Sequence, residues 1–172
     1  MPILAPYQSL FTHMAELQKI LESNATIRFH DCDPYQHLNN AKYINYFIDA
    51  REDQVREYYG LDIYKMGKEL GFSWMVTQNQ IAYLRPALLM EKVVIETQLI
   101  RYAEKTVTAE MRMWNESRSE LKSFMWSVFI YVNLRSHTSE KHPEHLMLLF
   151  REVCSPVEET IFENRFARLS KT

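Results

Sequence analysis

The N-terminal part of the chain shows two patterns of apolar residues. Four of them lie three or four positions apart, which places them on one face of a helix and predicts a helix over residues 8–22. These four are Leu10, Met14, Leu17 and Leu21. The next segment alternates apolar and polar residues and predicts a strand over residues 25–32.

A longer helical pattern covers residues 41–59. Asn39 and Asn40 precede it and are good helix caps, and Gly60 follows it as a C-terminal stop. Its apolar side chains occupy much of the helix circumference, which is typical of a helix surrounded by protein. A short second helix is predicted over residues 61–70.

From Phe72 onward the period of the pattern changes to two, which predicts four strands. These strands cover residues 72–84, 91–103, 105–115 and 121–134. Their short links favour antiparallel neighbours. The last strand is apolar on both faces, so we expect it to be central, with Trp126 and Val128 fully buried. A terminal helix is predicted over residues 144–153.

This order of elements predicts an α+β fold, a curved antiparallel sheet wrapped around one long central helix. We expect a single domain at residues 25–155, a helical extension at residues 1–24 and a tail at residues 156–172. A monomer of this kind exposes one sheet face and the sheet edges, which favours a homodimer. The strand at residues 105–115 has the cleanest alternation and the most polar outer face, so it is the predicted exposed edge.

Composition narrows the function. The 20 Lys and Arg against 22 Asp and Glu give a net charge of −2, without the basic surplus that nucleic-acid binding needs. The 3 glycines lie too far apart for a glycine-rich phosphate loop. The 2 cysteines cannot form a disulfide framework, and no export signal or membrane span is apparent, so we expect a cytoplasmic protein.

Residues 28–40 hold the densest group of polar side chains, in the loop between the first strand and the central helix. Asp31, Asp33 and His37 are acid–base groups. The helix start adds unpaired N–H groups that can stabilise an oxyanion. Because rigid elements hold this loop on both sides, it is the predicted site.

The motifs in this loop resemble those of a known family. Residues 31–34 (DCDP) and 37–41 (HLNNA), followed by Tyr43, resemble the active-site stretch of hot-dog-fold thioesterases of the 4-hydroxybenzoyl-CoA thioesterase type. Residues 49–51 (DAR) match the end of that family's central-helix motif, and residues 83–86 (YLRP) resemble the strand and turn that follow.

The resemblance implies acyl thioester hydrolysis, with Asp33 as general base or nucleophile and His37 as a second catalytic candidate. It implies substrate binding by Tyr43 and the helix start. The residues there are Asn39, Asn40 and Ala41. It implies no cofactor and no metal, an acyl-CoA substrate, and a homodimer or homotetramer. Residues 36–44 also resemble acyl-carrier-protein thioesterases, so that carrier is the alternative. Gln36 replaces a glycine that is common in the family's turn.

Each candidate residue also has a structural interpretation. Asp33 would order an Asx turn, and His37 would hydrogen-bond the loop. We interpret Asp31 as ordering the loop, and Asp49 with Arg51 as a structural pair. A metal site formed by the two loop acids and the histidine stays open as an alternative, although their spacing matches no zinc pattern.

Two other functions on the same fold remain alternatives. One is a protein that binds acyl groups without hydrolysing them. The other is a hydratase or dehydratase that uses Asp33 and His37. A cysteine nucleophile is disfavoured because the carboxylates on both sides of Cys32 raise the pKa of its thiol, and we expect it to be a small buried strand residue.

Overall fold

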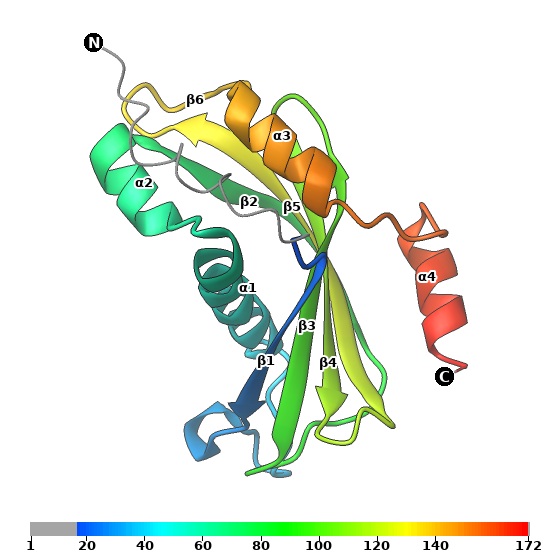
Figure 1. Cartoon of the computed structure of the whole chain (residues 1–172). Helices are drawn as coiled ribbons and strands as arrows, with labels where there is room; N and C mark the ends of the chain where they lie inside the picture. Colours follow the sequence, from blue (N-terminus) through cyan, green and yellow to red (C-terminus); the bar gives the residue numbers. More distant parts are fainter. Residues whose placement is uncertain (1–16, 172) are drawn as a thin grey trace.

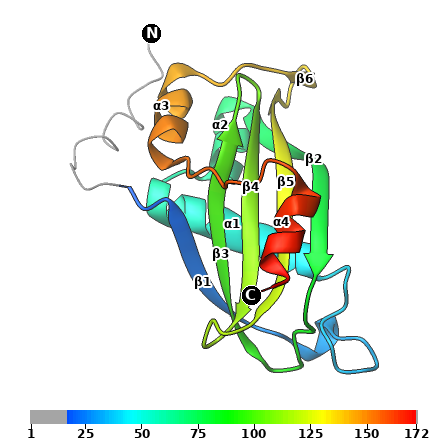
Figure 2. The same ribbon diagram turned by 90° about the vertical axis from the view of Figure 1, so that its right-hand side faces the viewer.

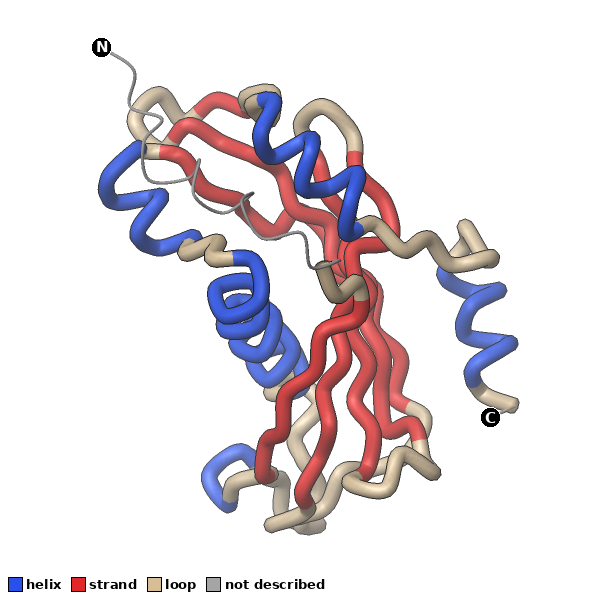
Figure 3. Tube along the Cα trace, in the orientation of Figure 1, coloured by secondary structure: helices blue, strands red, loops and turns tan. Residues whose placement is uncertain are grey.

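The computed structural model describes residues 17–171, in which a curved antiparallel sheet wraps around one long helix (Figure 1). The strands are β1 (Ile20–Thr26), β2 (Phe72–Tyr83), β3 (Lys92–Tyr102), β4 (Thr106–Asn115), β5 (Leu121–Asn133) and β6 (Thr138–Ser139). The helices are α1 (Tyr43–Tyr59), α2 (Ile63–Leu70), α3 (Glu144–Val153) and α4 (Phe162–Leu169). Figure 3 shows α1 and α2 on one side of the sheet and α4 on the other. The predicted α+β hot-dog fold is confirmed.

Helix α1 forms where the pattern predicts it but begins at Tyr43 instead of residue 41. A turn precedes it, because the Asn39 side chain accepts the N–H of Ala41 at 3.0 Å and the Asn39 carbonyl accepts the N–H of Lys42 at 2.8 Å. Gly60 ends the helix in the left-handed region, with φ 64°, as predicted. No helix within residues 17–171 is long and apolar enough to cross a membrane.

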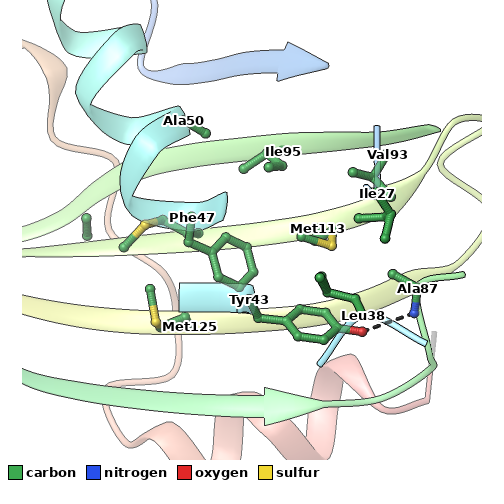
Figure 4. Close-up of a cluster of buried hydrophobic side chains, with 12 residues drawn as sticks. Ile27, Leu38, Tyr43, Phe47, Ala50, Ala87, Val93, Ile95, Met113 and Met125 are labelled. Carbon is green, nitrogen blue, oxygen red and sulfur yellow. Dashed lines mark hydrogen bonds between the residues drawn. The ribbon is translucent and has the colours of Figure 1, made fainter. Parts of the chain in front are cut away.

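The core lies between α1 and the concave face of the sheet (Figure 4). Tyr43 and Phe47 of α1 pack with Ile95, Met113 and Met125 of three different strands, and none of these side chains is more than 2% exposed. Burial of each side chain of this size contributes about 1.5–3 kcal/mol to stability. This packing fixes the first turn of α1 against the sheet.

The predictions for the N-terminal elements are partly wrong. Of the helix predicted over residues 8–22, residues 8–16 lie outside the described part of the chain, and residues 20–22 belong to strand β1. Leu21 is fully buried and pairs with Thr97 of β3, so sheet pairing overrides the helical spacing. The strand predicted over residues 25–32 ends at Thr26, and Phe29–Asp31 forms a single 3₁₀ turn instead.

The prediction of the exposed edge is also wrong. The sheet order is β1-β3-β4-β5-β2, so β4 lies inside the sheet and the edges are β1 and β2. The polar residues of β4 that suggested solvent exposure include Glu110, which is 0% exposed. Glu110 is buried although it is charged, because α4 covers it and Arg165 of that helix forms an ion pair with it.

Helix α4 lies within the segment that was predicted to be only a tail, and it covers part of the convex face (Figure 2). Phe162 and Leu169 pack there with Phe124 and Trp126 of the predicted central strand, β5. Trp126 is 2% exposed, as predicted. Val128 is partly exposed, contrary to the prediction, because it lies outside this cluster.

Candidate active site

A tight turn presents Asp33 at the end of the loop that leads to α1. The Asp33 carbonyl accepts the N–H of Gln36 at 3.0 Å, and the His37 carbonyl accepts the N–H of Asp33 at 2.8 Å. The Oδ1 atom of Asp33 accepts the N–H groups of Tyr35 at 2.9 Å and His37 at 3.1 Å. The turn requires a left-handed residue, and Gln36 takes that conformation with φ 64°. The backbone thus keeps the shape that suits the glycine of the family motif.

A second loop, between β2 and β3, holds this turn in place. The carbonyl of Ala87 accepts the N–H of Leu38 at 2.8 Å, and the carbonyl of Gln36 accepts the N–H of Leu89 at 2.9 Å. The hydroxyl of Tyr43 accepts the N–H of Ala87 at 3.0 Å (Figure 4). Two segments far apart in the sequence therefore form one rigid unit around the start of α1.

A buried ion pair supports the second loop. The Oε2 atom of Glu91 accepts the N–H of Leu88 at 2.7 Å, and its Oε1 lies 2.9 Å from the Nζ of Lys122. Burial opposes the charge on Lys122, but its hydrogen bonds to Glu91 and Glu120 outweigh burial and raise its pKa. A charged lysine thus holds the carboxylate that caps the loop.

These elements enclose a pocket of about 230 Å³. It is lined by Asp33, His37, Leu38, Asn40, Tyr43, Tyr83, Leu84, Arg85 and Pro86. Four of the predicted site residues therefore come together: Asp33, His37, Asn40 and Tyr43. Asn39 and Ala41 do not line the pocket, because they form the turn that precedes α1.

The two oxygens of Asp33 have different surroundings. Oδ1 is used by the turn, whereas no residue of the described chain donates a hydrogen bond to Oδ2. The side chain of His37 likewise makes no hydrogen bond within residues 17–171, although it lines the pocket. The structural interpretation of Asp33 therefore describes one oxygen, and the other oxygen remains available for chemistry.

Among the residues of the turn before α1, Asn40 lines the same pocket. The N–H of Ala41 is taken by the Asn39 side chain, and that of Lys42 by the Asn39 carbonyl. No acceptor among residues 17–171 takes the N–H of Asn40, whose carbonyl accepts the Tyr83 hydroxyl at 2.8 Å. Asn40, rather than Ala41, thus offers the donor that an oxyanion needs.

The neighbouring acid and thiol have structural roles. Asp31 accepts the Tyr46 hydroxyl at 3.0 Å and lies 3.4 Å from the Nζ of Lys42, so it ties the loop to α1, as predicted. Cys32 lies on no strand, contrary to the prediction, because β1 has already ended. Burial raises the pKa of its thiol most, and Asp31 and Asp33 raise it further. No three His, Cys, Asp or Glu side chains within residues 17–171 form a group suited to a metal.

Two polar residues of the pocket, Tyr83 and Arg85, had no role predicted from the sequence. Both lie at the end of β2 or just after it, in the YLRP segment whose likeness to the family was noted. The YLRP motif is recognisable in the sequence, but its position beside Asp33 depends on hydrogen bonds between the loop before α1 and the loop after β2. Tyr83 packs edge-on against Tyr43, with ring centroids 5.1 Å apart.

Comparisons with known proteins identify the family of the chain. A family model described as the thioesterase-like superfamily matches residues 27–148. The long-chain acyl-CoA thioesterase FadM of Escherichia coli is 23% identical over 116 residues, which span 67% of this chain and 86% of that protein.

Solved structures share the fold. The YbaW probable thioesterase of Escherichia coli matches with a TM-score of 0.67 and 21% identity, over 78% of this chain and 99% of that one. A 1,4-dihydroxy-2-naphthoyl-CoA thioesterase of Synechocystis, Slr0204, matches with a TM-score of 0.71 and 9% identity, over 80% and 99%. The Staphylococcus aureus protein SAV2348, solved in complex with CoA, matches with a TM-score of 0.71 and 15% identity, over 86% and 94%.

Proposed function

The chain belongs to the thioesterase-like superfamily, and on that premise we propose that it hydrolyses acyl-CoA thioesters in the pocket of Asp33. The observation that carries the proposal is the pairing of a carboxylate oxygen without a hydrogen-bond donor, Oδ2 of Asp33, with the unoccupied N–H of Asn40 in one pocket. Thioester hydrolysis needs these two elements, a base or nucleophile and an oxyanion donor.

In the proposed reaction, Oδ2 of Asp33 takes a proton from water as the water oxygen bonds to the thioester carbonyl carbon. The carbonyl oxygen becomes an oxyanion and accepts the N–H of Asn40. Collapse of this intermediate breaks the C–S bond, and the thiolate leaves with a proton, so that the products are a free acid and a thiol. In the nucleophilic variant, Oδ2 bonds to the carbonyl carbon first, the C–S bond breaks and the thiolate leaves with a proton, and water then hydrolyses the resulting anhydride to the free acid and the Asp33 carboxylate. Neither route uses a metal or a cofactor.

The carrier and the assembly are part of the proposal. Acyl-CoA is favoured as substrate because the named relatives include acyl-CoA thioesterases, and acyl carrier protein is the alternative carrier. We place the contact of a homodimer at the free edge of β2, where residues 75–79 are exposed. Met75 and Val76 there are 56% and 44% exposed, which is unusual for an unprotected edge strand.

Release of free thiol from a panel of aliphatic and aromatic acyl-CoA esters tests the reaction. We expect Asp33→Asn to lower the rate at least about 10²-fold, because the amide cannot act as base or nucleophile. Asp49→Asn, the same change at an exposed position on α1, is the matched control and should keep the wild-type rate. Near-normal turnover by Asp33→Asn would refute the mechanism. Binding without thiol release by the wild type would favour the acyl-binding alternative, and hydration of crotonyl-CoA would favour the hydratase.

Sedimentation tests the assembly. We expect Met75→Lys to give a monomer with reduced activity, because charge on an edge strand blocks pairing. Ile20→Lys is the matched control on the other edge, β1, where Ile20 is 37% exposed. If Ile20→Lys gives a monomer and Met75→Lys does not, the dimer contact lies at β1 and the proposed contact at β2 is wrong.

A further inference from the structure

Arg51 is a charged side chain without a charged partner beneath α1. Its Nη1 donates to the hydroxyl of Thr97, a fully buried residue of β3, at 3.0 Å. No carboxylate within residues 17–171 forms an ion pair with it. The predicted pair with Asp49 is wrong, because residues two positions apart on a helix face different directions. Asp49 is exposed and lines a separate polar pocket near His30.

The surroundings of Arg51 make this arrangement costly. Burial lowers the pKa of its guanidinium to about 10, which still leaves the group charged at neutral pH. Arg51 is partly buried, and a charge that is partly withdrawn from water without a counter-charge destabilises the fold unless a partner arrives. Two other arginines with little exposed side chain, Arg112 and Arg165, each form an ion pair with a glutamate of the chain.

Arg51 also lines an apolar pocket of about 130 Å³ between the second half of α1 and the concave sheet face. Its walls include Ile48, Leu99 and Phe129. The only other charged residue in the lining is Glu52, whose carboxylate accepts the hydroxyl of Tyr64 at 2.6 Å. The pocket therefore combines apolar walls with an arginine that forms no ion pair and a glutamate whose carboxylate is held by Tyr64.

This pocket and the pocket of Asp33 lie along the same helix. Tyr43 lines the first and Arg51 the second, and the eight residues between them span about 12 Å at the helical rise of 1.5 Å per residue. Four partly buried apolar side chains of α1 and the sheet pack against the core cluster that contains Tyr43, and two of them, Ile48 and Phe129, also line the pocket of Arg51. The four are Ile44, Ile48, Ile81 and Phe129. For an acyl group held at Asp33 to reach Arg51, its chain would run along these side chains.

We propose that Arg51 binds a carboxylate at the far end of the acyl group, so that the preferred substrates are CoA monothioesters of medium-chain dicarboxylic acids. This inference rests on the proposed function and specifies its substrate class. The ligand carboxylate supplies the missing counter-charge, and the apolar walls hold the methylene chain. A chain that ends in a methyl group fills the same walls but leaves the guanidinium without an anion.

The test compares octanedioyl-CoA with octanoyl-CoA, which have the same chain length and differ in the terminal carboxylate. We expect the wild type to show at least about a tenfold higher kcat/KM for octanedioyl-CoA, since only this ester can form a charge-assisted hydrogen bond with Arg51, and tenfold corresponds to about 1.4 kcal/mol. Arg51→Met should abolish that preference by losing activity on octanedioyl-CoA alone, and Arg51→Lys should retain part of it. Arg56→Met is the matched control, because Arg56 lies on the exposed side of the same helix.

Calorimetric binding to Asp33→Asn separates this inference from the proposed function. Tighter binding of octanedioyl-CoA than of octanoyl-CoA, lost in the double variant with Arg51→Met, supports the role of Arg51 even if the wild type releases no thiol. Equal binding and equal turnover of the two esters would overturn it. Equal losses on both esters in Arg51→Met would also overturn it and would make Arg51 a structural residue.

Discussion

Each face of the sheet holds a charged side chain that is partly or fully buried, but only the convex face supplies a charged partner. On the convex face, Glu110 is 0% exposed and accepts two hydrogen bonds from Arg165, at 2.9 and 2.7 Å, and one from the Trp126 indole at 2.8 Å. On the concave face, Arg51 has one neutral partner, Thr97. A complete network stabilises the fold, whereas our proposal for Arg51 is that a ligand supplies the missing anion.

The convex network also explains how α4 is held. Arg165 projects from α4 onto Glu110, and Phe162 of the same helix stacks on Phe124 with ring centroids 4.8 Å apart. The helix has only 8 residues, too few to be stable alone, so its helical form depends on this contact. The strand beneath it and the helix therefore stabilise each other.

The largest effect is expected at Trp126. Trp126→Ala should lower the free energy of unfolding by about 3–5 kcal/mol, because it opens a cavity under α4 and removes a donor to Glu110. Phe166→Ala is the control on the outer side of α4, where Phe166 is 41% exposed. Chemical denaturation with both variants checks the comparison. An unchanged midpoint for Trp126→Ala would mean that α4 does not pack on β5.

A somewhat smaller loss, about 3 kcal/mol, is expected for Arg165→Met, because Glu110 would remain buried with its main counter-charge gone. Arg112 lies 3.7 Å from Glu110 and limits the loss. Arg168→Met, three residues further along the helix and exposed, is the control. The double variant Glu110→Leu with Arg165→Met should recover most of the stability. If Arg165→Met and Arg168→Met unfold at the same denaturant concentration, the network is not a folding element.

The sequence predicts these two regions unequally, for physical reasons. Helix α1, with its broad apolar arc and its glycine stop, is recognisable from local pattern alone, and α3 is predicted at its observed bounds, Glu144–Val153. The edges of the sheet cannot be recognised in this way. The alternation in β4 predicts two different faces, but it does not reveal that a later helix, α4, covers the polar one. Leu21 shows the same limit, since its strand exists only through pairing with β3.

The candidate site shows the same division. Asp33, His37, Asn40 and Tyr43 lie close together in the sequence, and the motif was sufficient to group them. Which backbone N–H remains unoccupied was not predictable, since it depends on the Asn39 side chain turning onto Ala41. The position of Arg51 opposite Thr97 also requires the fold, because a helical residue two positions from an acid suggests a pair that the geometry does not allow.

A modest gain in stability is expected in the turn of Asp33. Gln36 has φ 64°, which costs a residue with a side chain about 1–2 kcal/mol, whereas glycine adopts it freely at an entropic cost of about 0.5–1 kcal/mol. Gln36→Gly should therefore raise the free energy of unfolding by about 0.5–1 kcal/mol. Tyr35→Gly is the control, since Tyr35 has a negative φ and should lose stability. Thermal unfolding of the two variants measures the difference, and a loss in Gln36→Gly would show that the Gln36 side chain outweighs its strain.

The smallest change in stability is expected for Arg51→Met, the same substitution as Arg165→Met but on the concave face. Arg51→Met removes a charge that has no counter-charge and keeps a side chain that fills the space, so the free energy of unfolding should stay within about 1 kcal/mol of the wild type or rise. Thr97 loses one donor, but its own hydroxyl still donates to Oε1 of Gln54 at 2.5 Å. The same arginine-to-methionine change thus separates the two faces: at Arg165 it costs stability, and at Arg51 it changes substrate choice. Parallel denaturation of the two variants measures this contrast, and a loss of about 3 kcal/mol at Arg51 as well would show that its charge is balanced within the folded protein and needs no ligand.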